Sequence, residues 1–468
     1  MEQSKSVAAA RDHTGSDSFA VRNVVTAFLS HQGRILLLRR SSRVGSYRGR
    51  WAGVSGFIEP NEDPLQRALK EIEEEVSLDR NSISLVQKGR PFPAFDPDIN
   101  TLWVVHPFLF SSSTSKIKLD WEHDAFRWIG KRDLHKFETV PRLKEALDRV
   151  TDETSMSRSI NPLVQARLIG VREDKVHGAS ELSRRALAAM KSLAQLSNAT
   201  TSEDLLSELR VLGYGLMNSH PSMASLTNLV GRSLHAIEGK AAEVSAVWEL
   251  KQAVAVICDQ VVEESEAAVH KIAVNAARLI KDDATILTHS RSSTVSETLK
   301  QAVAMGKGIR VIVTESRPLL EGRVVAEELS DLGVPVTFVV DSAIGTLMAT
   351  ADLCLVGTDS VLFDGSIVNK IGTYPLAVTA REHSKPFYVV CEKSKLNLRS
   401  IFEPEFEIEE KDPFEVLPYP MKNLITVSNP YFDRTPGKFV SKLITEDGEL
   451  SVEELPAVFR KMVAETYI

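Results

Sequence analysis

Three glutamates in the stretch after residue 63 could hold a metal ion. Glu71, Glu74 and Glu75 stand at positions i, i+3 and i+4, so a helix would place them on one face. Like charges this close repel each other, and a hard divalent cation such as Mg²⁺ or Mn²⁺ removes the repulsion. A solvated acidic helix face would need no metal, and the three glutamates alone leave both interpretations open.

The helix that must carry these glutamates is predicted to begin at Asp63. Asp63 is a good N-cap, and Pro64 suits the first helical position. Apolar residues recur at helical spacing from Leu65 to Val76 and form one buried stripe. We therefore expect the three glutamates on the opposite, solvent side of the helix.

Residues upstream of the helix complete a longer motif. The longer motif resembles the Nudix box. It consists of Gly56, then Glu62 after five intervening residues, then the run from Lys70 to Leu78 after seven more. The family pattern has arginine at the position of Lys70 and a second glycine at the position of Ser77. Lys70 keeps the positive charge but lacks the planar fork of arginine, which can bind carboxylates through two hydrogen bonds.

This resemblance implies a Nudix domain with hydrolase activity. Glu71, Glu74 and Glu75 would bind Mg²⁺ or Mn²⁺ against a diphosphate, with Glu74 and Glu75 in catalytic roles. Glu122 lies where many family members carry a late carboxylate that could serve as the base. The substrate would be a nucleoside diphosphate linked to another group, which the box does not identify.

A second set of polar residues follows predicted strands in the C-terminal half. Short β-branched runs at 285–287, 309–313, 336–340, 353–356 and 387–390 alternate with helical segments. This alternation predicts a mostly parallel sheet with helices on both faces. Ligands bind at the carboxyl ends of such strands. The polar segments that follow the first four runs are 288–293, 314–318, 341–343 and 357–373.

These segments resemble one superfamily as a set. It contains ribose-1,5-bisphosphate isomerase, methylthioribose-1-phosphate isomerase and the alpha, beta and delta regulatory subunits of the translation-initiation guanine-nucleotide exchange factor. The motifs that carry the resemblance are Thr288-His289, Glu315 to Pro318, Asp341 to Ala343, Gly357 to Asp359, Asn369 to Thr373 and Asn429 to Pro436, with Arg210 and His220 to Leu226 from the helical region.

The resemblance implies a pocket for a sugar phosphate or nucleotide. Asp359 matches a catalytic residue of the isomerases, but Ser290 stands where they carry a cysteine. A thiol titrates near about 8.5, and a serine hydroxyl is a far weaker acid. The pocket could therefore bind without turnover, as in the regulatory subunits, or act as an isomerase. The expected substrate-binding residues are Arg210, Ser290, Arg291, Arg317, Asn369 and Lys370.

Composition limits the other classes of function. The chain has 468 residues and a net charge of −7, which supplies no overall basic field for nucleic acid. No stretch approaches the roughly 20 apolar residues that span a bilayer. Its three cysteines, widely spaced, suit a reducing compartment, so we expect a cytoplasmic protein. Related folds often dimerise, and we expect at least a homodimer.

The predicted organisation follows from these patterns. An α+β Nudix domain would be followed by a helical subdomain and an α/β, Rossmann-like domain with a mostly parallel sheet. The predicted boundaries are a disordered tail at 1–20, the Nudix domain at 21–150, a Ser/Thr-rich linker at 151–162, the helical subdomain at 163–281 and the sugar-phosphate-binding domain at 282–468.

Overall fold

The computed structural model describes residues 20–96, 99–155, 162–174, 177–401, 408, 410–417 and 425–467. The chain forms two compact units, residues 1–151 with 460–468 and residues 152–459. Nearly all of the expected N-terminal tail lies outside the described residues. No helix in the described ranges is both long and apolar enough to cross a membrane.

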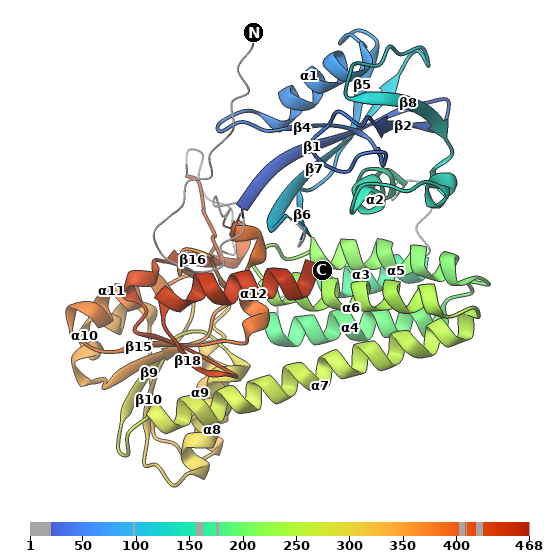
Figure 1. Cartoon of the computed structure of the whole chain (residues 1–468). Helices are drawn as coiled ribbons and strands as arrows, with labels where there is room; N and C mark the ends of the chain where they lie inside the picture. Colours follow the sequence, from blue (N-terminus) through green and yellow to red (C-terminus); the bar gives the residue numbers. More distant parts are fainter. Residues whose placement is uncertain are drawn as a thin grey trace. The chain divides into compact units, whose positions relative to one another are not determined.

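The first unit is built on an eight-stranded sheet (Figure 1). Strands β3, β2, β1, β7 and β5 lie in that order, with β4 on β1, β6 on β7 and β8 on β2. Only the β1–β7 pair among these is parallel. The elements are β1 (Ala20–His31), β2 (Arg34–Arg40), β3 (Trp51–Ala52), β4 (Val54–Phe57), α1 (Pro64–Val76), β5 (Ile83–Lys88), β6 (Phe92–Asp96), β7 (Thr101–Ser112), β8 (His123–Ile129) and α2 (Leu143–Ser155).

Apolar side chains cover both faces of this sheet. Side chains alternate between the faces of a strand, so Ala27 packs in the cluster with Ile72 of α1, whereas Phe28 packs in the cluster with Leu147 of α2. The sheet thus lies between the two helices.

Helix α1 begins where the sequence predicts. The Asp63 carboxylate accepts hydrogen bonds from the backbone N–H groups of Leu65 at 2.6 Å and Gln66 at 3.3 Å. The helix ends at Ser77, whose φ of 55° and ψ of 35° are left-handed. Glycine is favoured in this conformation because it has no Cβ.

The expected linker does not begin at residue 151. Helix α2 continues to Ser155, and the hydroxyl of Thr151 donates to the carbonyl of Leu147 at 2.7 Å instead of breaking the helix. The Ser/Thr-rich composition suggested a loop, but these residues extend a helix already anchored by apolar packing. Residues 156–161 of the expected linker lie outside the described residues.

The second unit begins with a group of helices around an apolar core. Leucines and valines from all five helices pack together in that core. Helix α7 is the longest of them, with 33 residues, and it runs on to the neighbouring sheet (Figure 1). The helices are α3 (Pro162–Arg172), α4 (Ala179–Leu196), α5 (Ser202–Met217), α6 (Ala224–Glu243) and α7 (Val247–Leu279).

A seven-stranded sheet follows, in the order β11-β10-β9-β12-β15-β17-β18. All its pairings are parallel except β17–β18. Helices α8 and α9 share a core with the end of α7, and α11 packs against β12 and β15. The elements are β9 (Thr285–Thr288), α8 (Ser293–Ala304), β10 (Arg310–Thr314), α9 (Gly322–Asp331), β11 (Val336–Val339), α10 (Ile344–Leu347), β12 (Leu353–Val356), α11 (Thr373–Glu382), β15 (Phe387–Val390), β17 (Lys442–Thr445), β18 (Gly448–Leu450) and α12 (Leu455–Tyr467).

A small antiparallel sheet lies beside the carboxyl end of β12. It consists of β13 (Ser360–Val361), β14 (Ile367–Lys370) and β16 (Phe432–Thr435). The mixed α/β class and the mostly parallel sheet are confirmed. The finer Rossmann-like description stays a prediction.

Candidate functional site

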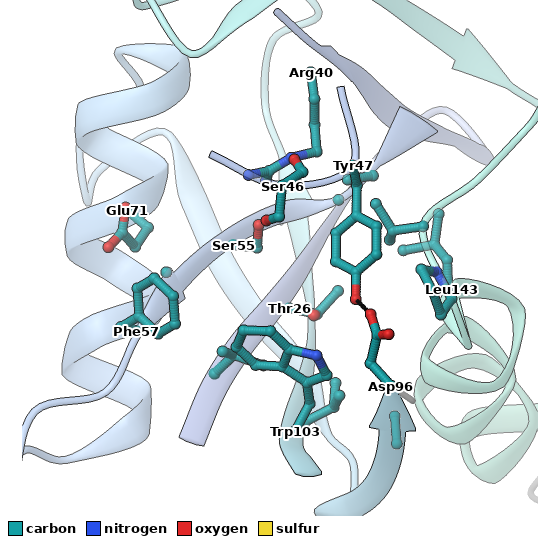
Figure 2. Close-up of a pocket in the computed structure, with 18 of the residues that line it drawn as sticks. Thr26, Arg40, Ser46, Tyr47, Ser55, Phe57, Glu71, Asp96, Trp103 and Leu143 are labelled. Carbon is teal, nitrogen blue, oxygen red and sulfur yellow. Dashed lines mark hydrogen bonds between the residues drawn. The ribbon is translucent and has the colours of Figure 1, made fainter. Parts of the chain in front are cut away.

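The first unit contains a cavity of about 250 Å³ beside α1. Charged residues line one end of it: Glu71 and Arg67 from α1, Arg40 from the end of β2, and Glu122 just before β8. Figure 2 shows Glu71 on its helix and Arg40 above the cavity. Two of the predicted carboxylates, Glu71 and Glu122, therefore lie at the same cavity.

The carboxylate of Glu71 is held by an arginine one turn earlier in the helix. Arg67 Nη2 lies 2.7 Å from Glu71 Oε1, and Arg67 Nη1 lies 3.7 Å from Glu62 Oε1. A Cβ on Gly56 would lie 1.9 Å from Glu71 Oε1, so the glycine admits the carboxylate. Burial raises the pKa of Glu71 in spite of the opposing charge of Arg67.

Glu75 is the most buried of the three glutamates, with 2% of its surface exposed. Its Oε1 accepts a hydrogen bond from the Ser55 N–H at 3.2 Å, whereas Oε2 has no hydrogen-bond partner among the described residues. Burial, and then the charge of Glu71, raises the pKa of Glu75 well above its ordinary value. Glu75, with one unsatisfied oxygen, thus lies next to Glu71, which lines the cavity.

A buried histidine faces the unsatisfied oxygen. His123 Nε2 lies 3.7 Å from Glu75 Oε2 and, like it, has no hydrogen-bond partner among the described residues. His123 Nδ1 lies 3.2 Å from Asp120 Oδ1, which favours the tautomer with the proton on Nδ1. His123 Nε2 and Glu75 Oε2 therefore face each other without a hydrogen bond between them.

The expectation that the three glutamates share a solvent-facing side was wrong for two of them. Glu71 and Glu75 are buried, and only Glu74 is exposed, with its Oε1 3.7 Å from Lys70 Nζ. The physical reason is the β4 segment, where Gly56 and the Ser55 N–H accommodate the two carboxylates. Glu74 and Glu75 do not line the cavity itself.

The donor atoms suit a hard divalent cation. Glu71 and Glu75 supply buried carboxylate oxygens whose mutual repulsion a cation would relieve, and one oxygen lacks a hydrogen-bond donor. Within the described ranges, however, no group of three or more His, Cys, Asp or Glu side chains is arranged to hold a metal. The chemistry of the residues fits Mg²⁺ or Mn²⁺, although Arg67 and Lys70 hold Glu71 and Glu74 here.

Aromatic side chains form the other end of the cavity, and sequence reasoning missed them. The Tyr47 hydroxyl donates to Asp96 Oδ2, and burial together with this bond raises the pKa of Tyr47. The rings of Trp103 and Phe57 lie 5.8 Å apart. Figure 2 shows Tyr47 between Trp103 and Leu143, with its hydroxyl on Asp96. No local motif marks these residues, since they come from different strands and loops.

The second unit holds a pocket of about 140 Å³ at the carboxyl ends of its parallel strands. Five of the predicted residues line it: Ser290, Arg291, Asp359, Asn369 and Lys370. They come from the segments after β9 and β12 and from β14. The structure therefore brings together most of the site residues expected for this half of the chain.

A carboxylate that sequence reasoning missed connects two of these residues. The Ser290 hydroxyl donates to Glu321 Oε1, and Lys370 Nζ lies 3.4 Å from Glu321 Oε2. Lys370 also lies over the ring of Tyr431, with Nζ 4.7 Å from its centre. Ser290 itself has a φ of 68°. The hydroxyl that replaces the isomerases' cysteine is thus bound to a carboxylate.

A buried histidine, His289, precedes Ser290 of the pocket. His289 Nε2 lies 2.8 Å from the Ile371 carbonyl and must carry the proton, so Nδ1 accepts from the Thr314 hydroxyl at 2.6 Å. Burial lowers the pKa of His289, which keeps the ring neutral. Gly372 has a φ of 107°, and a Cβ there would lie 2.8 Å from the His289 ring.

A buried lysine in this pocket was also missed. Lys395 lines the pocket, is 4% exposed and has no ion-pair partner among the described residues. It follows β15, the fifth predicted strand. The residues after the first four strands pointed to the pocket, and the same reasoning applied to the fifth would have found Lys395.

Two predicted residues lie outside the pocket. Arg210 is buried on α5, and its Nε lies 2.6 Å from Glu238 Oε1 on α6, so it joins two helices. Arg317 is exposed and donates from its side chain to the Val416 carbonyl at 3.0 Å. The resemblance to the isomerase superfamily suggested that both bind substrate, but the structure shows other partners for both.

Comparison with known protein families also divides the chain into two parts. The model of the initiation factor 2 subunit family matches residues 175–452, and that of the NUDIX domain matches residues 20–150. The chain belongs to the initiation factor 2 subunit family and carries a NUDIX domain ahead of the family region.

Two isomerases are among the proteins with similar sequences. The ribose 1,5-bisphosphate isomerase of Pyrococcus furiosus is 34% identical over 286 residues, which cover 59% of this chain and 87% of that protein. The methylthioribose-1-phosphate isomerase of Chloroflexus aurantiacus is 32% identical over 344 residues, 70% of this chain and 93% of the other.

Solved structures resemble the same part of the chain. The translation initiation factor eIF-2B of Pyrococcus horikoshii is 30% identical with a TM-score of 0.53, covering 61% of this chain and 96% of that one. The 5-methylthioribose 1-phosphate isomerase of the same organism is 26% identical with a TM-score of 0.54. The match covers 65% of this chain and 87% of that one.

Proposed function

We propose that the first unit is a metal-dependent diphosphatase that acts on a nucleoside diphosphate derivative. The observation that carries the proposal is the buried pair Glu71 and Glu75 beside a cavity that also holds Arg40, Arg67 and Glu122. Carboxylate oxygens suit Mg²⁺ or Mn²⁺, and arginines suit phosphate oxygens. The NUDIX match supports the same assignment.

Each residue has a separate role in this proposal. Glu71, Glu74 and Glu75 would hold the cation, which would neutralise phosphate charge and activate a water molecule. Glu74 is exposed, so its position does not suggest a metal ligand. We include it among the three ligands because of the NUDIX match. Glu122 would accept the proton of the attacking water, since it lines the cavity and burial raises its pKa.

The test is hydrolysis by the purified full chain. Incubation with Mg²⁺ and a panel of nucleoside diphosphate derivatives that includes ADP-ribose should release a nucleoside monophosphate, detected by mass spectrometry. Glu75→Gln should lower the rate at least about a hundredfold. The matched control is Glu73→Gln, an exposed position of the same helix, which should keep the rate. Full activity in Glu75→Gln would contradict the metal assignment.

For the second unit we propose a pocket that binds a sugar phosphate or a nucleotide. The buried cations Lys370 and Lys395 would neutralise phosphate, and Asp359 and Asn369 would bind sugar hydroxyls. The test is the binding of ribose 5-phosphate. Lys395→Met should weaken this binding, whereas the control Lys271→Met, on the exposed side of α7, should leave it unchanged.

Two activities of that pocket remain candidates. Ser290 hydrogen-bonded to Glu321 favours a non-catalytic, regulatory pocket, because a hydroxyl bound in this way is a poor proton donor. The isomerase relatives favour turnover with Asp359 as the catalytic residue. Following ribose 1,5-bisphosphate by ¹³C NMR separates them, since only isomerisation creates a ketone carbon.

We also propose that the chain forms at least a homodimer and is located in the cytoplasm. The free, buried state of all three cysteines is compatible with a reducing compartment. Light scattering of the purified protein tests the first proposal, and a mass equal to the single chain of 51.7 kDa would contradict it.

A further inference from the structure

The aromatic end of the first unit's cavity carries an unused hydrogen-bond donor. Trp103 Nε1 is buried and has no hydrogen-bond partner among the described residues. It lies near the hydroxyl of Tyr47, which donates its own hydrogen bond to Asp96 (Figure 2). A buried donor left without an acceptor is unfavourable, and a ligand acceptor would relieve this.

A hydrogen-bond acceptor lies next to this donor. Asp96 Oδ2 accepts the hydroxyl of Tyr47, and a carboxylate offers about four lone-pair sites, so it can accept further bonds. Figure 2 shows Asp96 beside the nitrogen-bearing edge of Trp103. This end of the cavity therefore presents one donor and one acceptor side by side, next to the flat face of the Tyr47 ring.

The charge of this end argues against a phosphate there. Of the cations that line the cavity, Arg67 is paired with Glu71 and Arg40 donates to the Ser46 carbonyl, whereas the aromatic end holds the carboxylate of Asp96. A flat, uncharged group fits between aromatic walls, and the bases of nucleotides stack on such rings. The cavity is thus divided into a charged end and a base-sized aromatic end.

We propose that Trp103, Tyr47 and Asp96 form a slot that selects adenine or cytosine, whose amino group lies beside an unprotonated ring nitrogen, over bases that present a carbonyl beside an N–H at the same edge. The amino group would donate to Asp96, and the adjacent ring nitrogen would accept from Trp103 Nε1. Guanine, hypoxanthine and uracil present the reverse order, a carbonyl beside an N–H. The inference rests on the proposed function, because it assigns the base of the same diphosphate substrate.

The test compares two ligands that differ only at this edge. ADP-ribose and IDP-ribose have the same size and charge, but hypoxanthine reverses the donor and acceptor of adenine. Calorimetry with the full chain in EDTA measures binding without hydrolysis. We expect ADP-ribose to bind about 10- to 100-fold more tightly, as the loss of paired buried groups predicts. Equal affinities, or no binding of either ligand, would overturn the inference.

Two variants assign any preference to this slot rather than to the pocket of the second unit. Trp103→Phe keeps the ring and removes the donor, so the preference for ADP-ribose should shrink by at least about fivefold. Asp96→Asn still accepts from Tyr47 and can donate to a carbonyl, so the preference should vanish or invert. A preference that both variants leave unchanged would place the nucleotide elsewhere and overturn the inference.

The hydrolysis assay separates this inference from the proposed function. Absence of hydrolysis with Mg²⁺, together with a base preference that depends on Trp103 and Asp96, would refute the diphosphatase and keep the slot. Equal kcat/KM for the two ligands, with a rate that depends on Glu75, would refute the slot and keep the diphosphatase.

Discussion

Arg67 Nη2 lies 2.7 Å from Glu71 Oε1, one helical turn away. Lys70, which stands where the Nudix pattern has arginine, instead points outward and lies 3.7 Å from the exposed Glu74. Arg67 also reaches Glu62, the other glutamate of the motif, at 3.7 Å. The orienting cation of this helix is therefore supplied three residues earlier than the motif predicts.

Removal of Arg67 should impair hydrolysis more than removal of Lys70. Arg67→Gln leaves Glu71 without its partner, and we expect kcat/KM to fall about 10- to 100-fold, as for residues that orient metal ligands. Lys70→Gln removes only an exposed pair and should change kcat/KM by less than about threefold. Equal losses in the two variants, measured under the same Mg²⁺ titration, would show that Arg67 has no special role.

Gly56→Ala should displace the Glu71 carboxylate. The new Cβ would lie 1.9 Å from Glu71 Oε1, and the flexible end of Glu71 can move away at little expense in stability. We expect a loss in kcat/KM of about tenfold or more, because displacements of about 1 Å at a reacting centre have effects of this size. Gly45→Ala, with no atom within 4 Å of its Cβ, is the control. Activity equal to that of the control would contradict the predicted displacement.

Ser77→Gly should stabilise the first unit. Ser77 ends α1 with a φ of 55°, which is unfavourable for a residue with a Cβ. Glycine removes this strain but has more freedom in the unfolded chain, so we expect a net gain of about 0.5–1 kcal/mol in the free energy of unfolding. Ser77→Ala keeps the Cβ and should give no gain. Urea denaturation of both variants measures the difference.

The contribution of His106 to the stability of the first unit should fall as the pH drops from 7 to 5. Burial, with a smaller contribution from Lys88, lowers the pKa of His106 to about 4. The unfolded chain binds the proton near 6.5 and the folded chain does not, so acid favours unfolding. At pH 5 the effect of this one group is about 2 kcal/mol.

His106→Gln isolates this contribution. The glutamine amide can still bond to the Asn23 side chain, which lies 3.0 Å from His106 Nε2. Relative to the wild type, the variant should gain about 2 kcal/mol between pH 7 and pH 5. Parallel stability curves for the two proteins over that range would refute the assignment of the pH effect to His106.

The sequence predicted local features of the fold well. The run at 285–287 is found as β9 (Thr285–Thr288), and the run at 336–340 as β11 (Val336–Val339). Both depend on short patterns of β-branched residues between turns, which local sequence determines. The cap at Asp63 is local for the same reason.

The missed features depend on contacts between distant segments. The burial of Glu75 depends on the Ser55 N–H twenty residues earlier, and no helical pattern reveals it. Arg210 was expected in a ligand pocket, but its partner Glu238 lies on another helix. Trp103 and Asp96 meet through strands β6 and β7, which pair side by side.

The cavity of the first unit has two ends that come from different stretches of chain. Two of the four residues of the charged end, Arg67 and Glu71, come from the box between Gly56 and Leu78, whereas Tyr47, Asp96 and Trp103 of the aromatic end lie outside it. Under the proposed function, exchange of the segments that carry those three residues would change the base that is bound without altering Glu71 or Glu75. The preference for a base and the proposed metal site could then change independently of each other.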